Sequence, residues 1–224
     1  LTGTYAEVNT FYNAAKTAGG ADPTISNATN IATINVTGTV TDAGNLKTIR
    51  DGFVVLKAGA TTNITNATEI QGSYAELVAV KTMNDEATFT GLGTQNLTSD
   101  ADTAISVANA NTLNGYGTGV TTATIAATSV TDLLANNSGL DDKSNNQNTD
   151  NAYTITIATT DAGGNATGDA SANAGKINDL DDLTSVDVNV LAVTALTGTY
   201  AEVNTFYNAA KTANNADPTI SNAT

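Results

Sequence analysis

Clustered aspartates are the residues of this chain whose types and spacing could do chemistry. Asp141 and Asp142 are adjacent, and Asp179, Asp181 and Asp182 lie within one four-residue stretch. Two carboxylates held together in a pocket can serve as general acid and general base, and carboxylate oxygens are the ligands that Ca²⁺ prefers. These five aspartates are therefore the candidate metal ligands, with calcium as the candidate ion.

Other kinds of catalytic site are excluded by residue types that the chain lacks. It contains no histidine and no cysteine, which excludes Ser-His-Asp and Cys-His nucleophiles and zinc held by imidazole or thiolate. Glycine patterns that bind phosphates or dinucleotides are also missing. Paired carboxylates need a concave pocket to catalyse anything, and the thin stacked repeats that the rest of the sequence predicts seldom provide one. We predict that the chain is not an enzyme and that calcium is its only candidate cofactor.

The calcium hypothesis matches no standard loop. Asp142, Ser144 and Asn146 have the one-three-five spacing of an EF-hand, but Gln147 occupies the glycine position and Tyr153 the position of the bidentate glutamate. Helix caps and solvated loops are the plainer interpretation of these side chains. We prefer that interpretation and keep calcium as the alternative.

The two ends of the sequence are copies of one another. Residues 196–224 repeat residues 1–29 except at two adjacent positions, where Gly19-Gly20 becomes Asn214-Asn215. The period is therefore 195 residues, and the chain holds one period and the opening of the next. We expect it to be part of a longer tandem array, because such self-similarity is the signature of repeat architectures.

The repeated opening predicts a short helix. Thr4 and Glu7 have the spacing of a capping box, in which each side chain bonds the backbone N–H of the other residue. Tyr5, Val8, Phe11 and Tyr12 then fall on one helical face. The same pattern in residues 196–224 predicts the same helix again.

The segment after this helix predicts two strands and two helices. Apolar and polar residues alternate over residues 31–40, which indicates a half-buried strand. Asp42 is expected to cap a helix with Leu46 facing inward, and residues 53–56 are expected to form a second strand. Ser73 then begins another capping box, so the unit is strand, helix, strand, helix.

Two further copies of this unit come later in the chain. Each copy has a candidate cap four residues before an inward apolar residue, in the pairs Asp42 and Leu46, Asn109 and Leu113, Asn173 and Ile177. The strands of the later copies are expected at residues 104–107, 120–125, 153–157 and 186–190. The predicted organisation is residues 1–30 as the end of a preceding sub-repeat, then sub-repeats 31–88, 89–150 and 151–224.

Such a unit cannot bury its own apolar face, whereas stacking on the next copy continues the core. Links that contain helices favour parallel pairing of the strands. The predicted fold is therefore a repeat solenoid, a β-rich α/β structure with short parallel strands linked by short capped helices. About three coils would make up each 195-residue period.

Charge and hydropathy limit the partners. The net charge is −14 with eight lysines and arginines in all, which argues against nucleic acid because binding a polyphosphate needs clustered cations. No apolar run approaches the roughly 18 residues of a membrane-spanning helix, so we expect no membrane insertion in this segment. A strongly acidic surface keeps a long array soluble.

The alternation of residues 42–49 with residues 1–8 and 196–203 resembles the tandem repeats of giant secreted and cell-surface proteins of cyanobacteria and other aquatic bacteria. This resemblance covers nearly the whole chain. It implies an extracellular or cell-surface location and a structural or adhesive role, often with calcium.

Two functions remain in competition. The leading hypothesis is a structural module of a very long extracellular protein that forms a filament, stalk or surface layer, with copies of itself as partners, head-to-tail or laterally. The alternative is an adhesin, or an ice- or carbohydrate-binding module that could depend on calcium, because threonines such as Thr33, Thr37 and Thr39 recur on one strand face. Threonine is also an ordinary residue of exposed strands.

Overall fold

The computed structural model describes residues 1–15, 30–100, 103–135, 139–141, 151–160, 163–169, 171–211 and 219–221. The chain divides into two compact units, Leu1–Asp100 with Tyr116–Gly119, and Ala101–Gly115 with Val120–Thr224. Its described residues form an α/β fold with mostly parallel strands and seven helices. The expected combination of parallel strands and short capped helices is thereby confirmed.

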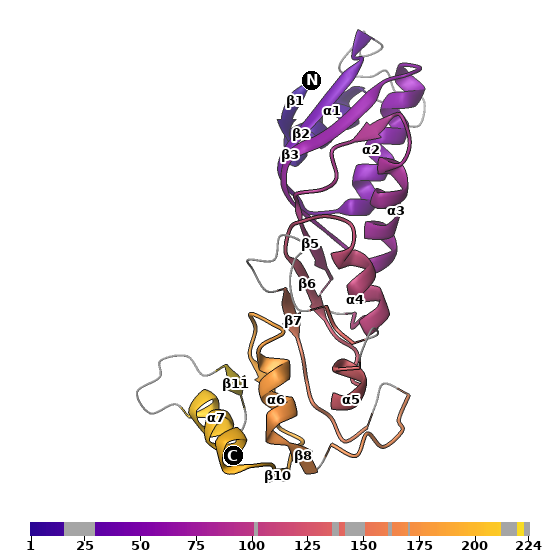
Figure 1. Ribbon diagram of the computed structural model, residues 1–224. Coiled ribbons are helices and arrows are strands. Elements are labelled where there is room, and N and C mark those ends of the chain that lie inside the picture. The colour runs from indigo at the N-terminus through magenta and orange to yellow at the C-terminus, as the bar shows by residue number, and fades with distance from the viewer. Residues whose placement is uncertain are drawn as a thin grey trace. The chain divides into compact units, whose positions relative to one another are not determined.

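Unit 1 has a parallel sheet with helices along one face. The strand order is β1-β2-β3-β5, with β4 also paired to β3, and every pair is parallel. Figure 1 shows α2 and α3 side by side along β2 and β3. The elements are β1 (Thr2–Thr4), α1 (Tyr5–Ala15), β2 (Thr33–Val40), α2 (Ala43–Leu56), β3 (Thr61–Gly72), α3 (Tyr74–Asn84), β4 (Phe89–Thr90) and β5 (Asn96–Ser99).

The core of unit 1 lies between this sheet and its helices. Ile34, Val36 and Val40 of β2 are buried, while Thr33 and Thr39 are exposed, so the predicted alternation over residues 31–40 is confirmed. The inward residues of α2 include Leu46, as expected. Because β1, β2 and β3 are each followed by a helix that returns over the same face, the sheet keeps a second, polar face.

The prediction of a strand at residues 53–56 is wrong. These residues are the last turn of α2, in which Phe53 is buried and Val55 is 86% exposed. In a strand both side chains would point to the same face, whereas two positions along a helix are about 200° apart. A short apolar run does not distinguish the two structures by its pattern alone.

The capping predictions are mostly confirmed. Asp42 and Asn173 are N-caps, and Ser73 with Glu76 forms a complete capping box. In the opening helix, Thr4 N–H donates to Glu7 Oε2 (2.8 Å) and Glu7 N–H donates to Thr4 Oγ1 (3.3 Å). The backbone bond from Thr4 holds the pKa of the Glu7 carboxyl below its usual value.

The cap proposed at Asn109 is wrong. The helix α4 (Val107–Asn114) begins earlier, with Ser106 as its cap and Ser106 Oγ accepting from Asn109 N–H at 3.2 Å. Serine and asparagine are about equally good caps, so residue type did not distinguish them. The equal cap spacing in three copies therefore does not hold, although Leu113 and Ile177 are buried as expected.

Unit 2 contains shorter parallel pairs. β6 pairs with β7, β8 with β10, and β9 with β11, all parallel. Besides α4, the elements are β6 (Thr121–Thr124), α5 (Val130–Leu133), β7 (Ala152–Thr154), β8 (Ser171–Asn173), α6 (Ala174–Asp181), β9 (Val188–Asn189), β10 (Ala195–Thr197), α7 (Tyr200–Ala210) and β11 (Ile220–Ser221).

Strands expected in the later copies form to different extents. Strands lie within the expected ranges 120–125 and 186–190, and β7 overlaps the start of 153–157. The strand expected at 104–107 is reduced to a bridge between Ile105 and Ile125. Ser106 turns the chain into α4 at that point, which leaves no room for a longer strand.

Candidate functional site

The first pair of candidate metal ligands is only half described. Asp141 is exposed, and its backbone N–H donates to Asn111 Oδ1 at 3.0 Å. Its carbonyl accepts from Asn151 Nδ2 at 3.2 Å. Asp142 lies outside the described residues. The described contacts of Asp141 are therefore backbone contacts that hold a loop.

The second set lies at the end of α6 and does not converge. Asp179 and Asp182 are not buried, and Asp182 is the C-cap residue of the helix. Asp181 accepts a hydrogen bond from Thr219 Oγ1 at 2.7 Å. Among the described residues, no group of three or more His, Cys, Asp or Glu could hold a metal ion. The calcium hypothesis stays a prediction without a described cluster behind it.

The environment of Asp181 disfavours its charge. Burial raises the pKa of the Asp181 carboxyl above its usual value, the bond from Thr219 opposes the shift, and the charges of Asp182 and Asp187 add to it. An acid with a raised native pKa destabilises the fold while it is ionised. The lost free energy of unfolding is recovered as the pH falls through that raised pKa. It is fully recovered below about 3.9, the pKa of aspartate in the unfolded chain.

We therefore expect Asp181→Asn to unfold at an equal or higher urea concentration than the parent at pH 7. The amide keeps an acceptor for Thr219 and carries no charge, so the advantage should shrink as the pH approaches 4. Urea unfolding at both pH values measures it. Asp179→Asn removes a carboxylate from the same helix and controls for net charge. A variant that is less stable than the parent at pH 7 would contradict the assignment.

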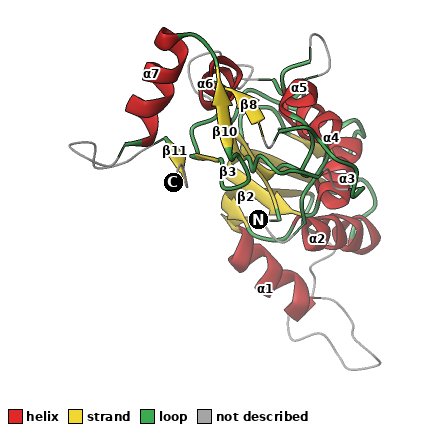
Figure 2. Cartoon of the chain, turned by 90° about the horizontal axis from the view of Figure 1, so that it is seen from below, coloured by secondary structure: helices red, strands yellow, loops and turns green. Residues whose placement is uncertain are grey.

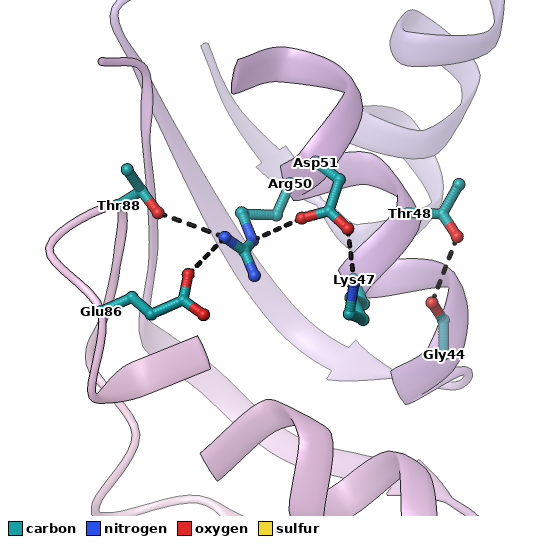
Figure 3. Close-up of polar contacts among 7 residues, drawn as sticks. All are labelled: Gly44, Lys47, Thr48, Arg50, Asp51, Glu86 and Thr88. Carbon is teal, nitrogen blue, oxygen red and sulfur yellow. Dashed lines mark hydrogen bonds and ion pairs between the residues drawn. The ribbon is translucent and has the colours of Figure 1, made fainter. Parts of the chain in front are cut away.

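Unit 1 contains a buried arginine with acidic neighbours. Arg50 of α2 is 8% exposed, and its Nη1 lies 2.6 Å from Glu86 Oε2 and 3.3 Å from Thr88 Oγ1. Its Nε lies 3.0 Å from Asp51 Oδ1, as Figure 3 shows. The guanidinium thus ties α2 to the segment between α3 and β4. Each of its described partners is a neighbouring protein side chain, so we assign it a structural role.

We expect Glu86→Ala to lower the free energy of unfolding by about 1–2 kcal/mol, because it leaves the buried guanidinium with one half-exposed carboxylate. Arg50→Met removes the buried charge itself and should cost less, because an apolar residue of similar length needs no partner. Urea unfolding of both variants and of the double variant tests this order. A larger loss of stability for Arg50→Met than for Glu86→Ala would contradict this order. It would show that the ion pair stabilises the fold by more than burial of the guanidinium destabilises it.

An open groove runs between α6 and α7. It has a volume of about 440 Å³ and includes Lys176 and Asp179 on one side and Glu202 on the other. Asn178 Nδ2 donates across it to Glu202 O at 3.1 Å. The Glu202 carboxylate accepts from Thr199 N–H and Oγ1 in a capping box, so its hydrogen bonds are used to begin α7.

The identical helices α1 and α7 have different environments. Tyr5 and Tyr12 in α1 are 7% and 8% exposed. Their counterparts Tyr200 and Tyr207 in α7 are 87% and 61% exposed, and Val203 is exposed whereas Val8 is fully buried. Tyr200, Val203 and Tyr207 form what we call the open face of α7. Figure 2 shows this helix beside α6.

Sequence reasoning found both copies of this helix but not the open face. Burial depends on the segment that comes after each copy, and identical residues carry no information about that segment. The repeat itself is the signal that could have revealed the open face. Residues 30–56 come after the first copy and have no counterpart after the second within these 224 residues. This face is the candidate functional site.

No family model, no curated protein and no solved structure matches this chain. Within the residues that the structure describes, no helix has the length and apolar character needed to cross a membrane. The repeat and the geometry of the two units are therefore the observations from which a function can be inferred.

Proposed function

We propose that the chain is a structural repeat module of a very long extracellular protein that forms a filament, stalk or surface layer. The observation that carries the proposal is the contrast between α1 and α7, in which one sequence is covered in its first copy and open in its second. An open apolar stripe with an identical, covered counterpart is the expected property of a repeat whose neighbour completes it.

In this proposal the parallel βα pairs continue from one period to the next as a solenoid, with about three coils per period. The parallel strands β1, β2 and β3 of unit 1, which helices join in turn, support this continuation because every added βα pair offers an open strand edge to the next. The net charge of −14 over these 224 residues gives a long array an acidic surface, which keeps it soluble. The resemblance to giant secreted repeat proteins supports the extracellular location, with calcium as an additional stiffening ion.

A second candidate, an ice- or carbohydrate-binding module, is favoured by the polar face of the sheet in unit 1. Thr33 of β2 lies opposite Thr61 of β3, and Asn35 opposite Asn63. A lattice would require regular spacing of these groups, but the register shifts twice along this pair, between Asn35 and Thr37 and between Gly38 and Thr39. We therefore place the binding function second. Inhibition of ice recrystallisation by the chain, or its capture on a glycan array, would favour the binding function over the structural one.

The test of the structural function uses the native protein. Antibodies raised against the chain would measure the size of the native polypeptide on an immunoblot of cells and medium denatured with chelator. Immunogold electron microscopy of intact cells with the same antibodies would show where the protein lies. We expect a polypeptide of many periods, labelled on threads or a layer outside the cell. A native polypeptide near 22.6 kDa, or label confined to the cytoplasm, would overturn the proposal.

A further inference from the structure

The first copy of the repeated helix shows what covers it. In α1, Tyr5 Oη accepts a hydrogen bond from Asn45 Nδ2 at 2.8 Å, and the ring of Tyr12 lies 5.6 Å from that of Phe53. Both partners belong to α2. The strand β1 before the helix pairs in parallel with β2, with Thr2 opposite Asn35. The cover of this helix is therefore the βα pair made of β2 and α2.

Gly52 makes this cover specific. A Cβ atom at Gly52 would lie 2.2 Å from the Tyr12 ring, which is closer than real Cβ contacts. The tyrosine thus packs against bare backbone on α2, and only glycine leaves room for it. Since Tyr207 is the same residue in the second copy, the same glycine would be needed to cover it.

The second copy makes its contacts on the opposite side of the same helix. In α7 this side faces α6, where Asn178 bonds Glu202 O and where Ala201 and Thr205 line the groove. Their counterparts in α1, Ala6, Glu7 and Thr10, are exposed. The neighbours of the two copies therefore lie on different sides of the helix and do not compete for one surface.

The contact of α6 with α7 repeats a contact inside unit 1. A Cβ at Gly175 of α6 would lie 2.6 Å from Glu202 Oε1, and a Cβ at Gly44 of α2 would lie 2.4 Å from Glu76 Oε1. In both places a glycine in the first turn of one helix faces the capping-box glutamate of the next. The packing of α6 on α7 is thus the same kind of step as the packing of α2 on α3.

We infer that the open face of α7 and the free edge of its preceding strand bind the segment Asn30–Leu56 of a following period. In that joint, Asn45 of the following period donates to Tyr200, its Phe53 and Gly52 pack on Tyr207, and its Asn35 lies opposite Thr197. Among the described strands β10 pairs with β8 alone, so its second edge is available for this pairing. The inference rests on the proposed function and names the partner of its repeat module.

The test compares one period with two. The first chain is residues 1–224, and the second is residues 1–224 followed by a further copy of residues 30–224, with Tyr200→Phe and Tyr207→Phe in the terminal copy. Tyrosines are nitrated with tetranitromethane and the chains are cut with trypsin. Peptides 1–16 and 177–211 then report Tyr5 with Tyr12 and Tyr200 with Tyr207 separately, since the cleavage sites differ in position.

In the single-period chain we expect Tyr200 and Tyr207 to react at least about tenfold faster than Tyr5 and Tyr12, because covered rings react only through local opening. In the two-period chain the internal Tyr200 and Tyr207 should slow to the rate of Tyr5 and Tyr12. An internal pair that keeps its single-period rate would overturn the inference.

A matched two-period chain carries Gly52→Leu in the second copy alone, where the side chain would meet the internal Tyr207. The fast rate should then return, and persistent protection would contradict the specific joint. Because these chains are engineered, the result does not depend on the length of the native protein. Failure of the joint and failure of the extracellular array are therefore distinguishable.

Discussion

Replacing Phe53 with alanine is expected to lower the free energy of unfolding by about 3–5 kcal/mol, the range for a large aromatic residue removed from a core. Phe53 is fully buried, and its ring lies 6.3 Å from that of Phe11 and 5.6 Å from that of Tyr12. The variant therefore loses both the burial of the ring and its aromatic contacts with α1. Urea unfolding followed by far-ultraviolet circular dichroism measures the loss.

Val55→Ala is the matched control, because Val55 is two residues away on the same helix and 86% exposed. Its effect should stay within about 0.5 kcal/mol, as for most surface substitutions. In a strand the two side chains would share a face and both variants would be costly. Similar losses of unfolding free energy at the two positions would indicate that residues 53–56 form a strand, which would contradict the helix.

Tyr12→Ala and Tyr207→Ala make the second large contrast, since one substitution is placed in two identical helices. Tyr12 is buried against Phe53, so its removal should cost about 3 kcal/mol. Tyr207 is 61% exposed, so its removal should change stability by less than about 0.5 kcal/mol. The change in helix propensity is the same at both sites, and the difference therefore isolates packing.

Thermal and urea unfolding of both variants provides the comparison. Hydrogen exchange of peptides 1–16 and 177–211 assigns each loss to its own copy of the helix. An equal loss at the two positions would mean that α7 is covered in the single-period chain, which contradicts the open face.

Local signals in the sequence predicted much of the fold. The capping boxes at Thr4 and Ser73 begin helices because their hydroxyl and carboxylate partners lie within one turn. The alternation over residues 31–40 places Ile34 and Val36 in the core because side chains of a strand point to opposite faces in turn. Both signals depend only on neighbours along the chain.

Other features depend on contacts that are distant in sequence. Phe53 is helical because its face of α2 packs on α1, about forty residues earlier, and a four-residue apolar run does not specify this. The aspartates at residues 179–182 are candidate ligands by spacing, but Asp181 lies about 200° around α6 from Asp179, and no group of three ligands forms among the described residues. The open face of α7 is the extreme case, because its residues are the same as those buried in α1.

In the proposed structure, successive periods stack into one continuous solenoid. Small-angle X-ray scattering of chains with one, two and four periods tests it most directly. If the joint forms, each added period lengthens the maximum dimension by the same increment, as in a stiff solenoid. If periods are instead independent bodies on flexible links, the dimensions grow roughly as the square root of the number of periods, and stacking is contradicted.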